Sequence, residues 1–286
     1  MQMEAKSADL AGQWPDHSPG EWITVAVALD TAVVPLIGSL LVLLGAVALT
    51  GVLLAVVRVV PVEKRKAHND VLGFVYAEIG VIYAVVLAMV VVGVWDTRAQ
   101  AHENTYTETN ALLQLTWYAR SLPQPDRDRL GGLVEQYTET VIRHEWPLLA
   151  RQHDDPAAWR EFTAIRELVN TQEPTGDADA ARYQGALDAV ASLGDARRER
   201  VNEAATAGVP TLLWVALLVG ALVTIGFAQL FGMDSVRAHA GVVFSLSATV
   251  GVMLLIVYEF NYPFSGPLKV SPTAFELALD RIRSLN

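Results

Sequence analysis

Cysteine is absent from this chain of 286 residues, and charged residues are scarce, at 18% of the sequence. Without cysteine there is no disulfide bond, no thiolate metal site and no cysteine nucleophile, whichever compartment the chain occupies. Basic residues are outnumbered, because 21 Lys and Arg stand against 31 Asp and Glu and give a formal net charge of -10. General binding to nucleic acid needs clustered Lys and Arg, so we expect no nucleic acid among the partners.

Signals for catalysis are also missing. His102-Glu103 and His144-Glu145 are adjacent pairs that point to different sides of a helix, so they lack the i, i+4 spacing of metal ligands. No glycine-rich phosphate loop follows a strand-like segment, and no set of Ser, His and Asp has a recognisable local context. We therefore expect no enzyme activity, no metal site and no cofactor.

Long hydrophobic runs are what the chain does contain. Hydrophobic residues make up 52% of it, and its mean hydropathy of +0.31 is outside the range of soluble proteins. Four runs, at residues 36–59, 71–95, 209–231 and 240–258, are each long enough to cross a bilayer core of about 30 Å as a helix. They predict a multi-pass protein of the cell (plasma) membrane with four transmembrane helices, whose first partner is the lipid bilayer.

Both ends of the chain are predicted to lie at the membrane surface. The first apolar stretch is too long for one crossing and Pro35 is its natural break, so residues 1–35 are assigned to an N-terminal tail and an interfacial segment. Residues 259–286 are predicted to form a surface turn at Pro263 and Gly266, followed by an amphipathic helix over 273–285. The apolar face of this helix carries Phe275, Leu279 and Ile282.

A polar insert, residues 96–208, separates the second and third spans. Its apolar residues recur at helical spacing and predict a bundle of helices. The first helix continues span two up to residue 121 as one rod, because no Pro or Gly interrupts residues 94–122, and the last runs through Arg197 and Arg200 into span three. The sequence thus predicts an all-α integral membrane protein, with transmembrane helices 1–2 at 36–95, an extramembrane helical bundle at 96–208 and transmembrane helices 3–4 at 209–258.

The charge near the spans predicts an orientation. With four spans, both termini and the bundle lie on one side of the membrane. The loop after span one holds the densest basic cluster, Lys64 to Lys66, which is typical of a cytoplasmic loop. The bundle and both termini are therefore predicted to be extracytoplasmic, although Arg197, Arg198 and Arg200 near span three count against this orientation.

Glu78 is the one ionisable residue well inside an apolar span. Burying a carboxylate in lipid costs on the order of 2 to 3 kcal/mol on insertion scales, so Glu78 is expected to face protein or water. At ~100° per residue, Val85 and Met89 share its face of the helix, and these three residues are the pore candidates. A stripe of small residues on another face suits close helix packing: Gly73, Ala77, Gly80, Ala84 and Ala88. In the alternative interpretation, Glu78 bonds to a neighbouring span and only fixes the register of the helices.

Several short stretches resemble the bestrophin-like family of bacterial membrane proteins. Their residues, in span two, in the insert and after span four, are Tyr83, Trp95, Glu108, Asn110, Glu145, Trp146, Arg197, Arg198, Pro263, Phe264 and Gly266. The resemblance implies four spans, a helical insert between spans two and three, and a ring-shaped homo-oligomer, pentameric in bestrophins, whose second spans line an ion pore. The basic loop after span one predicts the opposite orientation to bestrophins, whose large helical region is cytosolic.

Two hypotheses for the function follow. The first is an oligomeric bestrophin-like ion channel, with span two lining the pore and the ion unknown. The second is a non-conducting membrane scaffold or sensor whose helical bundle binds a partner. The mass of the solubilised particle separates them in part, because a monomer has no central pore.

Overall fold

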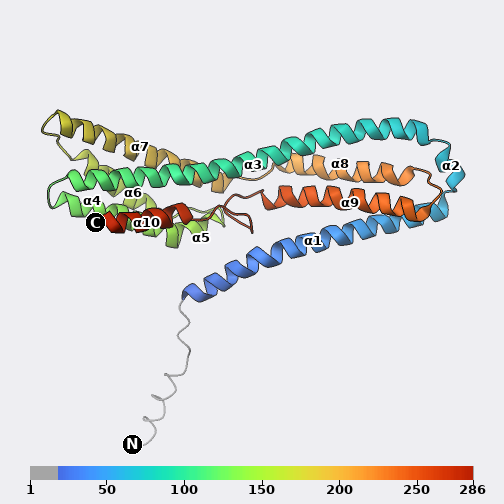
Figure 1. Cartoon of the computed structure of the whole chain (residues 1–286), viewed down its shortest axis with the longest axis horizontal. Coiled ribbons are helices and arrows are strands. Elements are labelled where there is room, and N and C mark those ends of the chain that lie inside the picture. The colour runs from blue at the N-terminus through green and yellow to red at the C-terminus, as the bar shows by residue number, and fades with distance from the viewer. Residues whose placement is uncertain (1–18, 286) are drawn as a thin grey trace, which may run out of the picture.

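The computed structural model describes residues 19–285, with side chains from Leu36 onward, so the predicted tail up to residue 18 lies outside the described residues. The described part is an elongated molecule with a helical bundle at one end and long helices at the other (Figure 1). In chain order its elements are α1 (Pro19–Val59), α2 (Val62–Lys66), α3 (Asn69–Ser121), α4 (Asp126–Thr140), the π-helix η1 (Val141–Glu145), α5 (Trp146–Leu149), α6 (Pro156–Asn170), α7 (Asp177–Thr206), α8 (Thr211–Leu230), α9 (Val236–Glu259) and α10 (Thr273–Leu285).

Helix α3 connects the two ends of the molecule. It has 53 residues, which corresponds to about 80 Å at ~1.5 Å per residue. It passes from the spans into the bundle as a single helix (Figure 1), which confirms the predicted continuous rod. Because one stiff element belongs to both halves, the position of span two is coupled mechanically to the bundle.

Within the described residues, four helices are long and apolar enough to cross a membrane, as the sequence predicts: Leu36–Val59 within α1, the apolar part of α3, α8 and α9. Helix α1 packs against α9, and α3 packs against α8. Helix α1 is continuous through Pro35, so the predicted break there is wrong. A proline removes one backbone hydrogen bond, and a membrane helix tolerates this loss when local geometry or neighbouring groups satisfy the freed carbonyl.

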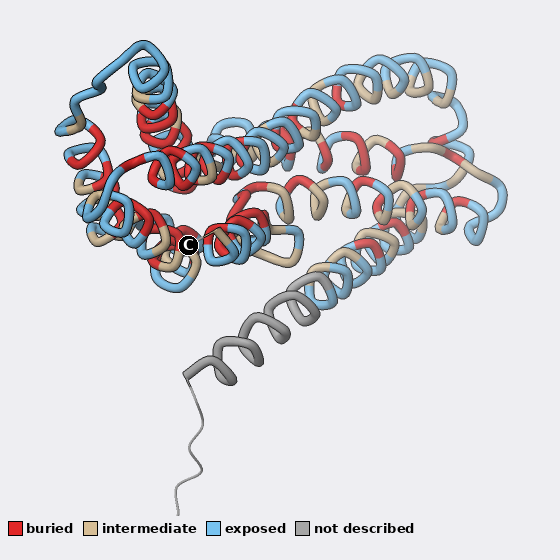
Figure 2. The backbone as a smooth tube through the Cα atoms, turned by 60° about the vertical axis from the view of Figure 1, so that its left-hand side comes forward, coloured by how far each residue is buried: buried red, intermediate tan, exposed pale blue. Residues whose placement is uncertain are grey.

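The bundle encloses the main hydrophobic core. Helices α4, α6, α7 and α10 surround the bundle half of α3, and Leu112, Leu130, Ile165, Leu193 and Phe275 are fully buried between them. Figure 2 shows buried backbone concentrated in this half, whereas the spans are largely exposed. An apolar surface that the protein itself leaves open is the expected state of helices that are covered by lipid.

Helix α7 ends at Thr206, so the prediction that it runs into span three is wrong. Gly208 has φ +127°, a backbone conformation that favours glycine, and Pro210 follows it directly before α8. The amide of Val209 donates to the side-chain Oδ1 of Asn261 at 2.7 Å. This bond joins the start of α8 to the end of α9 where both helices meet the bundle.

The C-terminal turn and helix are present as predicted, but the helix is covered by protein. Gly266 has φ +77°, and the amide of Val270 donates to the carbonyl of Pro263 at 2.7 Å to close the turn. The apolar face of α10 packs on α3 and α4, and Phe275 and Ile282 are buried in the bundle core. The apolar face of α10 is therefore part of the bundle core and is not a membrane-binding face.

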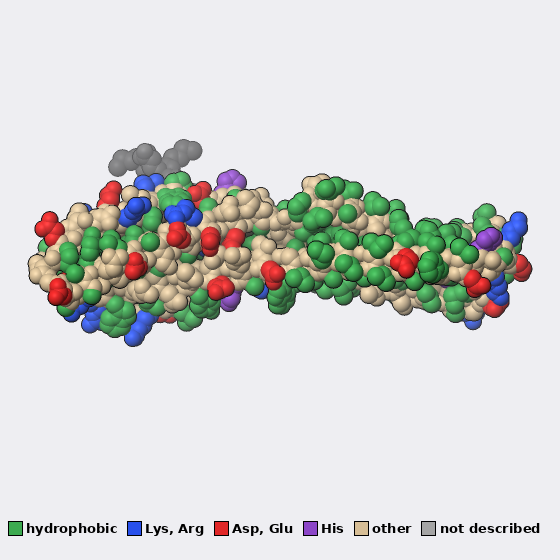
Figure 3. Space-filling model, turned by 90° about the horizontal axis from the view of Figure 1, so that it is seen from above, with side chains coloured by type: hydrophobic (Ala, Val, Ile, Leu, Met, Phe, Trp, Pro, Cys, Tyr) green, Lys and Arg blue, Asp and Glu red, His purple; other side chains and the backbone are tan. Residues whose placement is uncertain are grey.

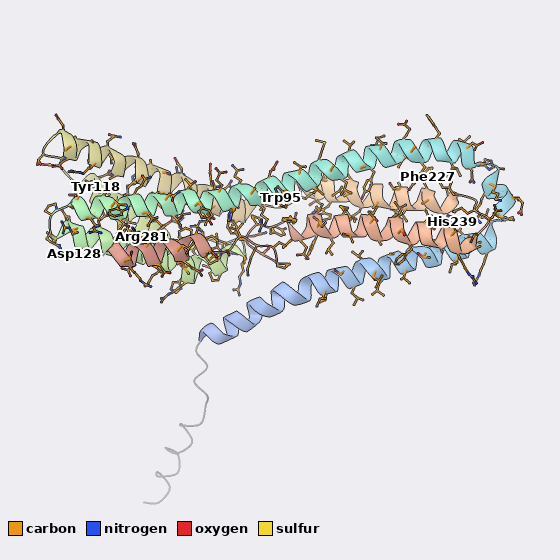
Figure 4. All side chains as sticks on the ribbon, viewed as in Figure 1. Trp95, Tyr118, Asp128, Phe227, His239 and Arg281 are labelled. Carbon is orange, nitrogen blue, oxygen red and sulfur yellow. The ribbon has the colours of Figure 1, made fainter. Side chains whose placement is uncertain are left out.

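The surface divides in the same way as the core. In the space-filling view the spans are covered by hydrophobic side chains, and charged side chains gather on the bundle and at the opposite tip (Figure 3). At that tip the Arg65 guanidinium is buried, and its Nη1 donates to the carbonyl of Phe231 at 3.0 Å. Trp95 marks the level where spans and bundle meet (Figure 4), the depth at which membrane proteins place aromatic residues.

Candidate functional site

Two features of the described residues combine charge with unusual placement. The first is a buried network in the bundle formed by Glu108 of α3, Tyr137 of α4, Glu145 of η1, and Arg197 and Arg200 of α7. All five side chains are 0% exposed. Charged residues are almost never fully buried unless they are paired, so each of these charges needs a partner inside the bundle.

Glu145 is held by both arginines. Arg197 donates to its two carboxylate oxygens, from Nη1 to Oε2 at 2.6 Å and from Nη2 to Oε1 at 2.5 Å. Arg200 adds a third charged bond, from Nη2 to Glu145 Oε2 at 2.8 Å. The bidentate fork is the strong form of this interaction, because two parallel bonds fix both distance and orientation.

Glu108 is bound to Arg200 in the same manner. Arg200 Nε donates to Glu108 Oε2 at 2.7 Å and Nη2 donates to Oε1 at 3.0 Å. The hydroxyl of Tyr137 donates to Glu108 Oε1 as well. Arg200 therefore bridges the two carboxylates and ties α3 to η1 through α7.

Aromatic rings cover the two arginines. The Arg197 guanidinium lies 4.7 Å from the centroid of the Trp159 ring, and that of Arg200 lies 5.4 Å from Trp146 and 5.5 Å from Phe275. Such cation–π contacts strengthen when both partners are removed from water. They also keep water away from the ion pairs, which raises the cost of breaking them.

The electrostatics of the network favour its charged form. Burial alone raises the pKa of Glu145, but the neighbouring Arg200 and Arg197 outweigh it and hold that pKa below its usual value. Burial and the Glu108 carboxylate raise the pKa of the Tyr137 hydroxyl well above its usual value. These shifts favour an ionised Glu145 beside the two guanidiniums and a neutral Tyr137.

The arrangement is suited to holding helices together and not to binding a ligand. Every carboxylate oxygen is engaged by a donor within the bundle. Only Arg197 Nε and Arg200 Nη1 lack a partner among the described atoms of these five side chains. Among the described residues there is also no cluster of three or more His, Asp or Glu placed to hold a metal ion.

A partly buried carboxylate lies closer to the membrane end of the bundle. Asn104 Nδ2 donates to Glu203 Oε1 at 2.8 Å, which links α3 to α7 a second time. Glu203 Oε2 is buried without a partner in the described part of the chain. Burial first, and then the nearby Glu199 carboxylate, raise the pKa of Glu203 to about 7. This contact is therefore sensitive to pH near neutrality.

The second feature is the side of α3 that faces away from the other spans. Glu78 is exposed there and, in the part of the chain that the structure describes, makes no hydrogen bond or ion pair. Val85 and Met89 lie on the same side and are 55% and 71% exposed. We call this line, defined by Glu78, Val85 and Met89, the outward face of α3.

The stripe of small residues is not the side of α3 that packs against the other spans of the same subunit. Tyr83, Val90 and Val94 are buried against α8 and α9, and the Tyr83 ring lies directly over Gly220. The residues Ala77, Ala84 and Ala88 of the small-residue stripe are exposed. The stripe is thus no packing face inside one chain, because the aromatic Tyr83 and the valines take that role.

The other residues of the bestrophin-like resemblance have separate places. Trp95 lies beside Phe260 with ring centroids 5.5 Å apart, and Phe264 stands edge-on to Trp146 at 5.5 Å. Asn110 is exposed on α3, and Arg198 pairs at the surface with Asp195. Pro263 and Gly266 shape the turn after α9. Only Glu108, Glu145 and Arg197, with Trp146 beside them, converge on one place.

Sequence reasoning missed Arg200 and Tyr137 as members of the network. Arg200 stands three residues after Arg197, a spacing that puts both on one helix face, and this was the available signal. Tyr137 is part of an apolar helical stripe, where its hydroxyl gives no separate pattern in the sequence.

Comparison with known proteins agrees with this geometry. A family profile described as a bestrophin-like domain matches residues 44–275. Crystal structures of two variants of a bacterial bestrophin homologue from Klebsiella pneumoniae share the fold with a TM-score of 0.64, at 13% and 12% identity, over 87% of this chain and 98% of theirs. The crystal structure of a membrane protein variant gives a TM-score of 0.61 at 13% identity, over 87% and 97% of the two chains. No curated protein matches the sequence.

Proposed function

The chain belongs to the bestrophin-like family, and we propose that it forms a ring-shaped homo-oligomer in which the outward face of α3 lines an ion pore through the cell membrane. A pentamer is the form that the family resemblance implies. The proposal assigns no enzymatic activity and no cofactor to the chain.

The observation that carries the proposal is the placement of Glu78. Its carboxylate lies about 10 Å inside the apolar part of α3, is exposed, and has no partner within the described part of the subunit. The interpretation in which Glu78 only fixes the register of the helices needs a bond to a neighbouring span, and none is present in the described part of the chain. An exposed carboxylate at this depth is stable when water or another subunit covers it, and a shared water-filled pore supplies both.

The rest of the outward face supports a continuous path along α3. At ~100° per residue, seven exposed polar residues of the bundle half lie within about 40° of Glu78 around the helix axis: Asp96, Gln100, Glu103, Thr107, Asn110, Gln114 and Ser121. Between Glu78 and this polar stretch stand the exposed apolar residues Val85 and Met89. A polar path interrupted by a short apolar stretch is typical of pores that are narrowed by hydrophobic side chains.

The scaffold or sensor hypothesis has less support. It needs a surface of the bundle built to bind a partner, but the conspicuous charges of the bundle are buried and paired with one another. The network instead explains how α3 is held in place, since Glu108 lies on the same helix as Glu78.

The orientation with the bundle outside the cell remains part of the proposal. The basic cluster Lys64 to Lys66 supports this orientation, and Arg197, Arg198 and Arg200 near span three count against it. Because the chain has no cysteine, single substitutions at Asp128 in the bundle and Lys64 in α2 give clean probes. An impermeant maleimide added to intact cells is expected to label Asp128→Cys and to leave Lys64→Cys unlabelled. Labelling of Lys64→Cys alone would place the bundle on the cytoplasmic side.

The channel proposal is tested by single-channel recording from purified protein in planar bilayers. We expect currents from the wild type, and a changed reversal potential in a salt gradient for Glu78→Gln, which keeps the shape and removes the charge. The matched control is Glu167→Gln, which neutralises an exposed carboxylate on α6 far from α3's outward face. Silence of the wild type in all salts would reject the channel and leave the scaffold.

A further inference from the structure

A cavity of about 490 Å³ opens beside α3 at the level where spans and bundle meet. One wall is α3, with Val86, Val90 and Gly93. The opposite wall is the start of α8, with Leu213, and the end of α9, with Phe260. Its size falls within the range of sites that hold small ligands, and it is independent of the buried network.

The cavity arises because two helices end beside one that continues. Helix α7 stops at Thr206 and α9 stops at Glu259, whereas α3 passes through this level without interruption. Gly93 widens the gap, because a Cβ built at this position meets nothing within 4 Å. The space is therefore a consequence of the fold and has a place where a side chain can be added without displacing its neighbours.

The depth of the cavity points to lipid. Val86 and Val90 belong to the apolar part of α3, while Trp95 and Phe260, whose ring centroids are 5.5 Å apart, stand at its bundle end. Paired aromatic rings at this position mark the headgroup level of a bilayer. The body of the cavity thus faces the hydrocarbon layer, and its bundle end faces the headgroups.

The residues that line the cavity are likewise apolar toward the hydrocarbon layer and polar toward the headgroups. Its walls are aliphatic or aromatic except at Thr97 and Asn261 and the backbone near Gly208, all toward the bundle. Arg98 lies next to the rim, with its guanidinium carbon 5.6 Å from the centroid of the Phe260 ring. Its Nε donates to the carbonyl of Leu268 at 2.6 Å, and its Nη atoms have no partner in the described part of the chain. The guanidinium therefore has donors left for an anion.

We propose that this cavity binds one acyl chain of an anionic phospholipid, with the lipid phosphate at Arg98. The apolar walls take the chain and the guanidinium takes the phosphate, a group that arginine binds with two parallel hydrogen bonds. The nearest acidic residue on the same helix, Asp96, points to the other side of α3, because two positions are about 200° apart around the axis. The site is formed within one subunit, and Met89 of the outward face of α3 also lines it.

The test is native mass spectrometry of the purified full-length protein, with phosphatidylglycerol and phosphatidylcholine added in equal amounts. We expect the wild type to retain phosphatidylglycerol, and Gly93→Leu to retain at least about tenfold less, since the new side chain occupies the space of several methylene groups. The control is Gly45→Leu on α1, where a Cβ also meets nothing within 4 Å and which does not line this cavity.

Arg98→Gln is the second variant, and it decides the question even when Gly93→Leu does not fold. It is expected to retain both lipids equally, because the acyl-chain site stays and the phosphate partner is lost. Unchanged retention in Gly93→Leu, or an unchanged preference for phosphatidylglycerol in Arg98→Gln, would overturn the proposal. A smaller oligomer mass for Gly93→Leu with normal lipid retention would assign the cavity to contact with a second copy instead.

Discussion

The bundle and the spans treat charge in opposite ways. In the bundle, four fully buried charges, those of Glu108, Glu145, Arg197 and Arg200, neutralise one another inside a single subunit. In the spans, Glu78 stands alone on the outward face of α3 with nothing from the described part of its own chain against it. The network is complete within the subunit, so removing one partner would leave a buried charge uncompensated. Glu78, by contrast, has to be covered by water or by protein outside the described part of its own chain.

The same contrast separates the apolar residues. Those of the bundle are covered by their own chain, and those of the spans remain largely open (Figure 2). The bundle therefore sets the position of α3 at one end, and in the proposed oligomer lipid and neighbouring subunits complete its surroundings at the other. Variants in the two regions are expected to fail differently, the first in stability and the second in conduction.

The largest effect is expected from removing one partner of the buried network. Arg200→Ala leaves Glu108 buried without its guanidinium and takes one bond from Glu145. Breaking a buried ion pair in this way costs about 3 to 5 kcal/mol, because the remaining carboxylate stays desolvated. The measurement is thermal unfolding in detergent, followed by circular dichroism and by the fluorescence of the tryptophans that cover the arginines.

Arg198→Ala is the matched control, since Arg198 pairs with Asp195 at the surface of the same helix. Exposed pairs contribute about 0 to 1 kcal/mol, so this variant should unfold close to the wild type. Equal destabilisation by the two substitutions would show that the buried network does not hold the bundle together.

A smaller effect is expected where α3 packs on α8. A Cβ at Gly220 meets the Tyr83 ring, so Gly220→Val forces the ring aside and is expected to cost about 1 to 3 kcal/mol, the usual cost of overpacking. Gly226→Val on the same helix is the control, because a Cβ there meets nothing within 4 Å. If the two variants unfold at the same temperature, Tyr83 does not set the distance between α3 and α8.

The smallest effect concerns pH and Glu203. Its pKa is raised from 4.5 to about 7 in the folded protein, so its stabilising contribution is complete below pH 4.5 and is lost as the pH rises through about 7. The full shift corresponds to about 3 kcal/mol, and solvent screening at this partly buried side chain reduces the expected loss to about 1 kcal/mol.

Glu203→Gln imitates the protonated side chain, and Gln Oε1 still accepts from Asn104. The difference in unfolding free energy between pH 5 and pH 8 should therefore be about 1 kcal/mol smaller in this variant than in the wild type. Glu199→Gln changes only the neighbouring charge and is expected to have a weaker effect in the same direction. Identical pH dependence in wild type and Glu203→Gln would contradict the assignment.

Much of the fold follows from patterns that are local in the sequence. The absence of Pro and Gly between residues 94 and 122 predicts the α3 rod, and the long apolar runs predict the four spans. Local rules fail where a distant part of the chain decides. Pro35 does not interrupt α1, and the apolar face of α10 is covered by the bundle. The surroundings of a segment determine whether a proline breaks a helix and whether an apolar helix face packs on protein or on the membrane.

The site was less accessible from the sequence. Glu108, Glu145 and Arg197 are separate in the chain, and only the fold brings them together around Arg200. Arg197 and Arg200 are fully buried, and burial of a charged residue depends on partners that the sequence alone does not place. Glu78 is different, because a single carboxylate in an apolar run can be recognised from the sequence alone. The structure adds that no neighbour in the described part of the chain neutralises it.

The most direct test of the central claim is whether water reaches Glu78 in the open protein. Since the chain has no cysteine, a charged thiol reagent in a planar-bilayer recording acts only on an introduced residue. We predict that it alters the current through Glu78→Cys and leaves unchanged the current through Leu41→Cys, which is 62% exposed on α1. Modification of Leu41→Cys currents, with Glu78→Cys unaffected, would contradict a pore along the outward face of α3.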